Sequence, residues 1–128
     1  MKKPHIAVLG ATGVVGRHIL EILEELKVPY ESIKLLSSAK SAGSRLNFDG
    51  VEHIVEEAKP DSFNNVDIVL ASAGASTSKK FAPEIVKRGG LIIDNSSAFR
   101  MEEKVPLVIA GVNDDDLKEH AGIVANPN

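Results

Sequence analysis

The chain has 128 residues, of which 43% are hydrophobic, 26% charged and 4% aromatic, and its formal net charge is −3. This composition is typical of one globular domain with an aliphatic core and excludes a disordered or fibrous chain. The acidic balance argues against a nucleic-acid partner or a membrane surface, and because no apolar run is long enough for a membrane span or a signal peptide, we expect a cytoplasmic protein.

The start of the chain predicts a strand, a helix and a second strand. A β-rich run at His5–Leu9 ends directly in Gly10 and indicates a buried strand. Apolar residues at helical spacing over Val14–Leu26 predict an amphipathic helix, which Pro29 ends. The second strand is Ser32–Leu36, and the three elements form one right-handed βαβ unit.

The middle of the chain predicts a loop, a hairpin and another strand. Small, hydroxyl and basic residues over Ser37–Arg45 are typical of a loop. Asp49-Gly50, inside Leu46–Glu57, is a hairpin signal between two short β-prone stretches. Val66–Gly74 predicts a third buried strand that ends in small residues.

The last part continues the alternation of helices and strands. A helix is expected from near Ser78 to Arg88, ended by Gly89-Gly90 although Pro83 lies inside it. The remaining expected elements are a strand and loop over Leu91–Arg100, a strand over Val105–Asn113, a short acidic helix over Asp114–Glu119 that Asn113 caps, and a strand over Gly122–Ala125.

This alternation predicts a doubly wound, mostly parallel α/β sheet, a Rossmann-type domain that spans residues 1–128. In such sheets ligands bind beyond the carboxyl ends of the strands. The loops that follow the predicted strands are therefore where function is expected.

The first of these loops contains Gly10, Gly13 and Gly16, between a strand and a helix. This is the position of the dinucleotide fingerprint, although the spacing is GxxGxxG and not GxGxxG. Glycines there let the backbone approach a pyrophosphate, which the free N–H groups and the helix dipole stabilise. Close packing of the helix on the strand is the alternative explanation.

The loop after the second strand favours NADP(H) over NAD(H). An NAD-binding domain usually has Asp or Glu there to hold the ribose 2′-hydroxyl, and this chain has no acid at that position. Ser37, Ser38, Lys40 and Ser41 offer hydroxyls and a cation instead, which suit a 2′-phosphate. The alternative is a solvated polar loop.

Two later loops complete the predicted edge. The small residues Ala71–Gly74 would let a flat nicotinamide or a ribose lie against the backbone. The stretch Asp94–Arg100 ends in Arg100, whose planar guanidinium can hold a phosphate or carboxylate with two hydrogen bonds. Alone, an arginine after a strand is more often a surface ion-pair partner.

Other patterns predict less. Tyr30 and Lys34 match the YxxxK pair of short-chain dehydrogenases, but they lead into the second strand, at the opposite end of the sheet from the glycines. Asp114–Asp116 suit the first turn of a helix better than a metal site. The four histidines have no ligand spacing, so no metal is expected.

The stretches LGATGVVG, SSAKSAG, DNSSAFRM, VPLV and NPN follow one another in this order. With them the chain resembles the amino-terminal NADP-binding domain of the aspartate-semialdehyde dehydrogenases over nearly all of its length. N-acetyl-γ-glutamyl-phosphate reductase is similar in its glycine loop, but it typically has a different sequence in place of DNSSAFR and lacks SSAKSAG.

The resemblance implies NADPH-dependent reductive dephosphorylation of aspartyl 4-phosphate to aspartate semialdehyde, in lysine, methionine and threonine biosynthesis, by a homo-oligomer. It also implies roles for particular residues. Thr12, Gly13, Val14 and Val15 would hold the pyrophosphate, Lys40 and Ser41 the 2′-phosphate, Ser72, Ala73, Gly74 and Asn95 the nicotinamide half, and Arg100 the substrate phosphoryl group.

Departures from the family limit what we expect of this chain. In the family a cysteine directly after Asn-Pro-Asn attacks the acyl phosphate and a histidine is the acid/base, whereas this chain has no cysteine and ends at Asn128. We therefore expect no catalytic residue, no catalytic and dimerisation domain, and NADPH binding without turnover. Lys40 replaces a common arginine, and Ala110-Gly111 replaces the usual Pro-Glu.

Two other functions stay open on the sequence. One is a free-standing NADP(H)-binding sensor or regulatory module, and the other is a domain like that of N-acetyl-γ-glutamyl-phosphate reductase. A fragment of a short-chain reductase would need Tyr30 and Lys34 beside the nicotinamide, which the polarity of the sheet opposes.

Overall fold

The computed structural model describes residues 3–96 and 122–125. These residues form a six-stranded sheet in the order β5-β2-β1-β6-β7-β8 and a separate two-stranded sheet, β3-β4. The elements are β1 (His5–Leu9), α1 (Val14–Glu25), β2 (Ser32–Ser37), β3 (Arg45–Phe48), β4 (Val51–Ile54), β5 (Glu56–Glu57), η1 (Pro60–Phe63), β6 (Ile68–Ala71), α2 (Ala75–Lys87), β7 (Leu91–Asp94) and β8 (Ile123–Ala125). The predicted Rossmann-type α/β fold is confirmed.

Every pair of neighbouring strands in the large sheet is parallel. The chain moves outward from β1 to β2 and β5, and then returns to pair β6 with the other side of β1. Ligands of open parallel sheets bind at such a reversal, beyond the carboxyl ends of the strands. The topology therefore brings the loops after β1, β2 and β6 to one place.

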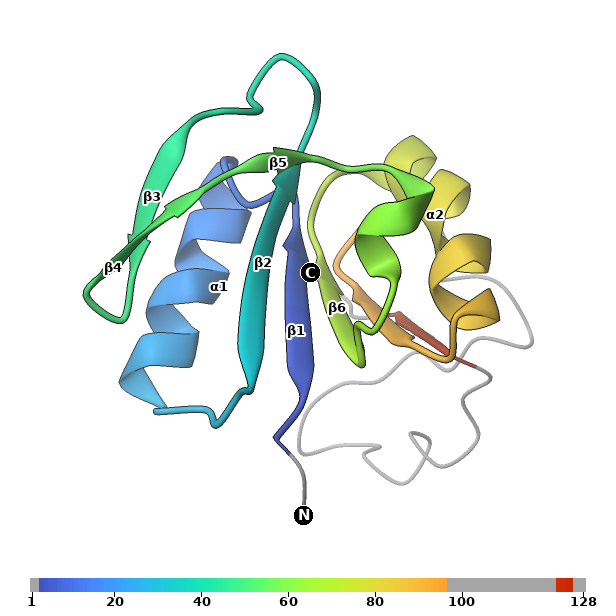
Figure 1. Cartoon of the computed structure of the whole chain (residues 1–128). Coiled ribbons are helices and arrows are strands. Elements are labelled where there is room, and N and C mark those ends of the chain that lie inside the picture. The colour runs from blue at the N-terminus through green and yellow to red at the C-terminus, as the bar shows by residue number, and fades with distance from the viewer. Residues whose placement is uncertain (1–2, 97–121, 126–128) are drawn as a thin grey trace.

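Helices cover the sheet on both faces, with α1 and the hairpin on one side and α2 and η1 on the other (Figure 1). Because both faces are covered, β1 is apolar at nearly every position. On the α2 side, Phe63 and Phe81 contact each other with ring centroids 5.4 Å apart. On the α1 side, Leu20 and Phe48 are buried in a cluster with Val8.

The hairpin has the turn that Asp-Gly predicts. Asp49 and Gly50 both have positive φ, 52° and 76°, as a two-residue hairpin turn requires. The turn is held to the rest of the fold, because the Tyr30 hydroxyl donates to Asp49 Oδ2 (2.7 Å) and the Asp49 N–H donates to Glu24 Oε1 (2.9 Å).

Three boundaries differ from the sequence predictions. The hairpin ends at Ile54, and Glu56–Glu57 forms a separate strand that pairs with β2. Helix α2 begins at Ala75 and not near Ser78, because Gly74 is its N-cap and the Ser78 N–H already donates to the Gly74 backbone oxygen (3.1 Å). The 3₁₀ turn η1 was not predicted.

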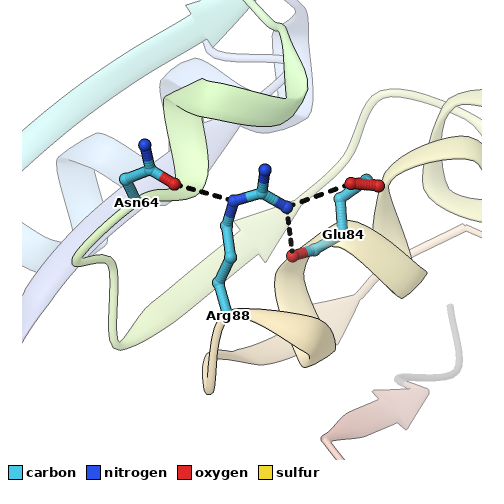
Figure 2. A network of polar contacts seen from close by, with 3 residues as sticks. All are labelled: Asn64, Glu84 and Arg88. Carbon is cyan, nitrogen blue, oxygen red and sulfur yellow. Dashed lines mark hydrogen bonds and ion pairs between the residues drawn. The ribbon is translucent and has the colours of Figure 1, made fainter.

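The carboxyl end of α2 is fixed by a polar network (Figure 2). The Arg88 guanidinium donates from Nε to Asn64 Oδ1 (2.7 Å) and from Nη1 to both the backbone oxygen (3.1 Å) and Oε1 (3.0 Å) of Glu84. Gly89 follows with φ 86°, as predicted for a glycine that ends a helix. The network joins the helix to the turn before β6.

Several predicted features lie outside the described residues. They are the strand over Val105–Asn113, the helix over Asp114–Glu119, Arg100, Ala110-Gly111 and the terminal Asn-Pro-Asn. Within residues 3–96 and 122–125, no helix combines the length and apolarity of a membrane span, and no three potential metal ligands cluster.

Candidate functional site

A pocket of about 510 Å³ lies at the carboxyl edge of the sheet. This volume is within the range of small-molecule and cofactor sites. The loops after β1, β2 and β6 line it together with β5 and α2. The lining residues are Leu9, Gly10, Thr12, Gly13, Ser37, Ser38, Ala39, Ser41, Glu57, Ala58, Ser72, Ala73, Thr77, Lys80 and Phe81.

Gly10 forms the floor of the pocket where three strands converge. Its φ is 90°, and a Cβ at this position would lie 3.0 Å from the backbone N and Cα of Ala73. The Gly10 N–H also donates to the backbone oxygen of Leu36 (2.9 Å). Any side chain at Gly10 would therefore push the ends of β1 and β6 apart.

Gly13 and Gly16 differ in what their missing side chains allow. A Cβ on Gly16 would lie 2.1 Å from the backbone oxygen of Gly10, so Gly16 lets α1 pack closely on β1. A Cβ on Gly13 would meet only that same oxygen, at 3.5 Å, which is an ordinary contact. Gly13 lines the pocket, whereas Gly16 is buried away from it. The packing interpretation is thus confirmed for Gly16, whereas pyrophosphate binding at Gly13 stays a prediction.

The amino end of α1 faces the pocket without a cap. Gly13 is the N-cap residue, no side chain in the described part of the chain caps the helix, and the first turn holds no acidic residue. The first turn of a helix leaves N–H groups without an intrahelical acceptor, and its dipole favours an anion. The side chains of Val14 (88% exposed) and Val15 (44%) lie on the surface, so these two residues can offer a ligand only their backbone N–H groups.

The serine loop supplies hydroxyls to the same pocket. Ser37 ends β2, and its hydroxyl lies 3.0 Å from Thr12 Oγ1, which links this loop to the glycine turn. Ser38 and Ser41 also line the pocket, and Ser41 turns back on Ser38 through a backbone hydrogen bond of 3.1 Å. Lys40 is exposed and does not line the pocket.

The small-residue turn after β6 contains a buried polar atom without a partner. Ser72 lines the pocket, and its buried Oγ has no hydrogen-bond partner among residues 3–96 and 122–125. Such atoms are rare in folded proteins, and a ligand is one source of the missing partner. Ala73 also lines the pocket, whereas Gly74 is the exposed N-cap of α2 and Asn95 lies beside β6, its N–H donating to the backbone oxygen of Ala71 (2.9 Å).

Sequence reasoning missed the charged residues of the pocket. Glu57 reaches the pocket from β5, where its strand partner is Ser37. It was missed because the sequence predicts a single hairpin over Leu46–Glu57. Lys80 comes from α2, one turn after Thr77, and its Nζ lies 5.2 Å from the centroid of the Phe81 ring. The spacing of Thr77, Lys80 and Phe81 on one helix face was the available signal.

The Tyr30 and Lys34 pair lies away from this pocket, as expected. Tyr30 donates to Asp49, and Lys34 Nζ donates to the backbone oxygen of Ser62 (2.9 Å). The hydrogen bond to Asp49, followed by burial and the nearby charges of Asp49 and Glu24, raises the pKa of the Tyr30 hydroxyl above 10.0. A phenol with a raised pKa, bonded to a carboxylate, is poorly suited to donate a proton to a substrate.

The pocket therefore offers hydrogen-bond donors to an anionic ligand. An uncapped helix terminus, hydroxyls and two small-residue turns converge there. Among the described residues, no nucleophile with an adjacent base lines it.

Comparisons with known proteins agree with this description. Residues 5–120 match the family model for the semialdehyde dehydrogenase NAD binding domain. The chain is 54% identical, over 97% of its length, to the aspartate-semialdehyde dehydrogenase of Bacillus subtilis (strain 168).

Solved structures give the same result. The structure of aspartate semialdehyde dehydrogenase II from Vibrio cholerae complexed with ASA superposes with a TM-score of 0.94 at 37% identity, and covers 99% of this chain and 42% of that one. The aspartate semialdehyde dehydrogenase with NADP from Candida albicans has a TM-score of 0.80 at 25% identity, over 98% of this chain and 42% of that one. The chain spans about a third of the length of its curated relatives, 36% for the B. subtilis protein.

Proposed function

The chain belongs to the semialdehyde dehydrogenase family, whose NAD-binding domain it contains, and from this we propose that it is the cofactor domain of an NADP(H)-dependent aspartate-semialdehyde dehydrogenase. The observation that carries the proposal is the single pocket in which the glycine turn, the serine loop and the turn after β6 meet. The proposed reaction is reductive dephosphorylation of aspartyl 4-phosphate to aspartate semialdehyde, in amino-acid biosynthesis.

The residues present fit the cofactor, which would supply the hydride when bound. The N–H groups of the first turn of α1 face the position proposed for the pyrophosphate, and Gly13 leaves room for it. Thr12 and Ser37 hold the two adjoining loops together. Ser72 offers a buried hydroxyl toward the nicotinamide half. These groups bind and orient; none of them transfers a proton.

The preference for NADP(H) rests on the serine loop. Ser38 and Ser41 line the pocket, and Lys40 stands between Ala39 and Ser41, which both line it. Lys40 forms no ion pair with the described part of the chain, so its charge is available to a 2′-phosphate. Glu57 is the opposing feature, because a carboxylate near Ser37 can accept hydrogen bonds from an unmodified ribose.

Titration of the 128-residue chain with NADPH and NADH tests the coenzyme. We expect NADPH to bind at least tenfold more tightly, because a charge-assisted hydrogen bond to the 2′-phosphate contributes roughly 1.5–3 kcal/mol. Lys40→Ala should remove most of this preference. Lys27→Ala, an exposed lysine after α1, is the matched control and should not. Equal affinities for the two coenzymes would contradict the proposal.

Glu57→Gln tests whether Lys40 with the serine hydroxyls, or Glu57, contacts the 2′ position of the ribose. If Lys40 and the serines read a 2′-phosphate, removing the charge of Glu57 leaves NADPH affinity unchanged or raises it. If Glu57 holds a ribose hydroxyl instead, NADH affinity falls about tenfold and the assignment of NADP(H) is wrong.

The remaining roles are proposals about a longer protein. Arg100 is proposed to bind the substrate phosphoryl group, and Gly74 and Asn95 to border the nicotinamide half. We propose that the nucleophile, the acid/base and the dimer surface belong to sequence beyond these 128 residues, since the relatives are nearly three times as long. Formation of semialdehyde by the 128-residue chain alone would contradict this division. The cytoplasmic location stays a prediction.

A further inference from the structure

Asp94 is a buried carboxylate that the proposed cofactor contacts leave unexplained. It is the last residue of β7 and has no exposed surface. Its Oδ1 accepts hydrogen bonds from Ser78 Oγ (2.7 Å) and the Ser96 N–H (3.0 Å), and its Oδ2 accepts one from Ser96 Oγ (2.6 Å). A carboxylate is costly to bury and is retained only when such donors satisfy it.

Asp94 is not among the residues that line the pocket, and its side chain lies on the α2 face of the sheet. Asp94 is the strand partner of Ala71, and side chains of partners in a parallel sheet share a face. Ala71 packs in the α2-side core with Phe81 and Ile85, and Ser78, which bonds to Asp94, is a fully buried residue of α2. Asp94 can therefore act on a ligand only through the residues that it holds.

What Asp94 holds is the turn at the end of β7. Ser96 donates its N–H to one carboxylate oxygen of Asp94 and its hydroxyl to the other. These two hydrogen bonds fix the backbone from Asp94 to Ser96. The intervening Asn95 is fixed at a third, because its N–H donates to the backbone oxygen of Ala71. Asn95 follows the Asp94–Ala71 pair and thus lies next to Ser72, whose unpartnered hydroxyl lines the pocket.

We propose that Asp94 is a positioning residue, which fixes Asn95 against Ser72 through Ser96 and so orders the part of the pocket that receives the nicotinamide half of the cofactor. This inference rests on the proposed function. It predicts that loosening the turn weakens contacts to one half of the dinucleotide and leaves the other half unaffected, since the 2′-phosphate is proposed to bind at the serine loop, from which Ser38 and Ser41 line the pocket.

The direct substitution Asp94→Ala leaves a buried Ser78 hydroxyl without a partner, and the protein then fails to fold in the worst case. Ser96→Ala is the better test, because it removes one hydrogen bond to the carboxylate and keeps the backbone N–H. Ser96→Thr is the conservative variant that retains the hydroxyl. Ser78→Ala is the matched control, since it removes another hydrogen bond to Asp94 from the helix side and not from the turn.

Binding of two ligands to the 128-residue chain distinguishes the outcomes. NADPH contains both halves, and adenosine 2′,5′-bisphosphate contains only the 2′-phosphate end. We expect Ser96→Ala to weaken NADPH binding about fivefold and to reduce the fluorescence change of the nicotinamide on binding, with unchanged affinity for the bisphosphate. Ser96→Thr should restore both signals, and Ser78→Ala should lower Tm with both affinities within twofold of the original.

Equal weakening of both ligands by Ser96→Ala would overturn the proposal and make Asp94 part of the general fold only. Unchanged binding of both ligands would overturn it as well. If the unsubstituted chain bound neither ligand, the proposed function would fail, and this result is distinct from either outcome for Ser96.

Discussion

The two ends of the parallel sheet use their polar groups differently. At the amino ends of the strands, Asp67 accepts a hydrogen bond from the His5 N–H (2.8 Å), and the His5 ring lies 2.6 Å from the Ser32 hydroxyl. At the carboxyl ends, Ser72 Oγ is buried without a partner and no side chain of the described part caps α1. At the amino ends these polar groups hydrogen-bond to one another, whereas the carboxyl ends leave hydrogen-bonding groups available to a ligand.

This contrast has an energetic meaning. A buried polar group without a partner costs about 1–3 kcal/mol, so a fold that leaves such groups at one end gives up stability there. A bound dinucleotide can accept hydrogen bonds from these groups, and because it binds only the folded state it would raise the free energy of unfolding. Substitutions at the amino end should therefore change stability only, and some substitutions at the carboxyl end should change binding only.

The largest effect is expected at Gly16, which belongs to the carboxyl end but serves packing. Gly16→Ala places a Cβ 2.1 Å from the Gly10 oxygen, so α1 must move off β1. We expect a loss of about 3 kcal/mol or more and a fall in Tm of roughly 10 °C. Urea unfolding measures the change. Unaltered stability would mean that the helix can shift freely and that the close packing is not required.

Gly13 lies three residues before Gly16, and Gly13→Ser should change NADPH affinity without lowering stability. Gly13 is an N-cap without a side-chain bond, and serine is a better N-cap than glycine, so stability should stay the same or rise by a few tenths of a kcal/mol. The added hydroxyl would compete for the N–H groups of the first turn and project toward the pocket. We expect NADPH affinity to fall at least tenfold, as measured by calorimetric titration. Retained affinity would contradict the pyrophosphate assignment.

Arg88 tests the opposite end of the sheet. Arg88→Ala removes one hydrogen bond from the end of α2 to Asn64, in the turn before β6, and two to Glu84 within the helix (Figure 2). The ion pair with Glu84 is about three-quarters buried. We expect a loss of about 1–2 kcal/mol in urea unfolding with no change in NADPH affinity. Arg45→Ala is the matched control, because its exposed ion pair with Glu52 should contribute less than about 0.5 kcal/mol. Weakened NADPH binding in the Arg88 variant would erase the distinction between the two ends.

Within the described residues, the sequence predicted the order of the elements, apart from β5 and η1, and the sheet edge where the pocket lies, because both depend on local signals. Apolar runs, Gly10 and the hydroxyl-rich loop are readable without tertiary contacts, and the topology of a doubly wound sheet then brings them together. Asp-Gly specified the hairpin turn for the same reason.

Contacts between distant segments were not predictable. Glu57 enters the pocket only because β5 pairs with β2, and a two-residue strand has no periodicity to detect. The bond between Ser78 and Asp94 joins residues that are 16 positions apart, so no local pattern indicates it. Nor could the sequence distinguish Gly13 from Gly16, since their difference is a distance to one backbone oxygen.

The smallest effect is expected at Tyr30, where the amino end depends on pH. The hydrogen bond to Asp49 raises the pKa of the Tyr30 hydroxyl in the folded state above 10.0, so folding favours the protonated phenol. The stabilisation is fully present below pH 10 and is lost as the pH rises through the folded-state pKa. Tyr30→Phe should cost about 0.5 kcal/mol at pH 7. Urea unfolding from pH 7 to 11 should show the unsubstituted chain losing its advantage over the variant as the phenol ionises. A constant difference in the free energy of unfolding across this range would mean that the hydrogen bond does not shift the pKa of Tyr30. NADPH affinity at pH 7 should be unchanged, because Tyr30 lies at the amino ends of the strands, away from the pocket.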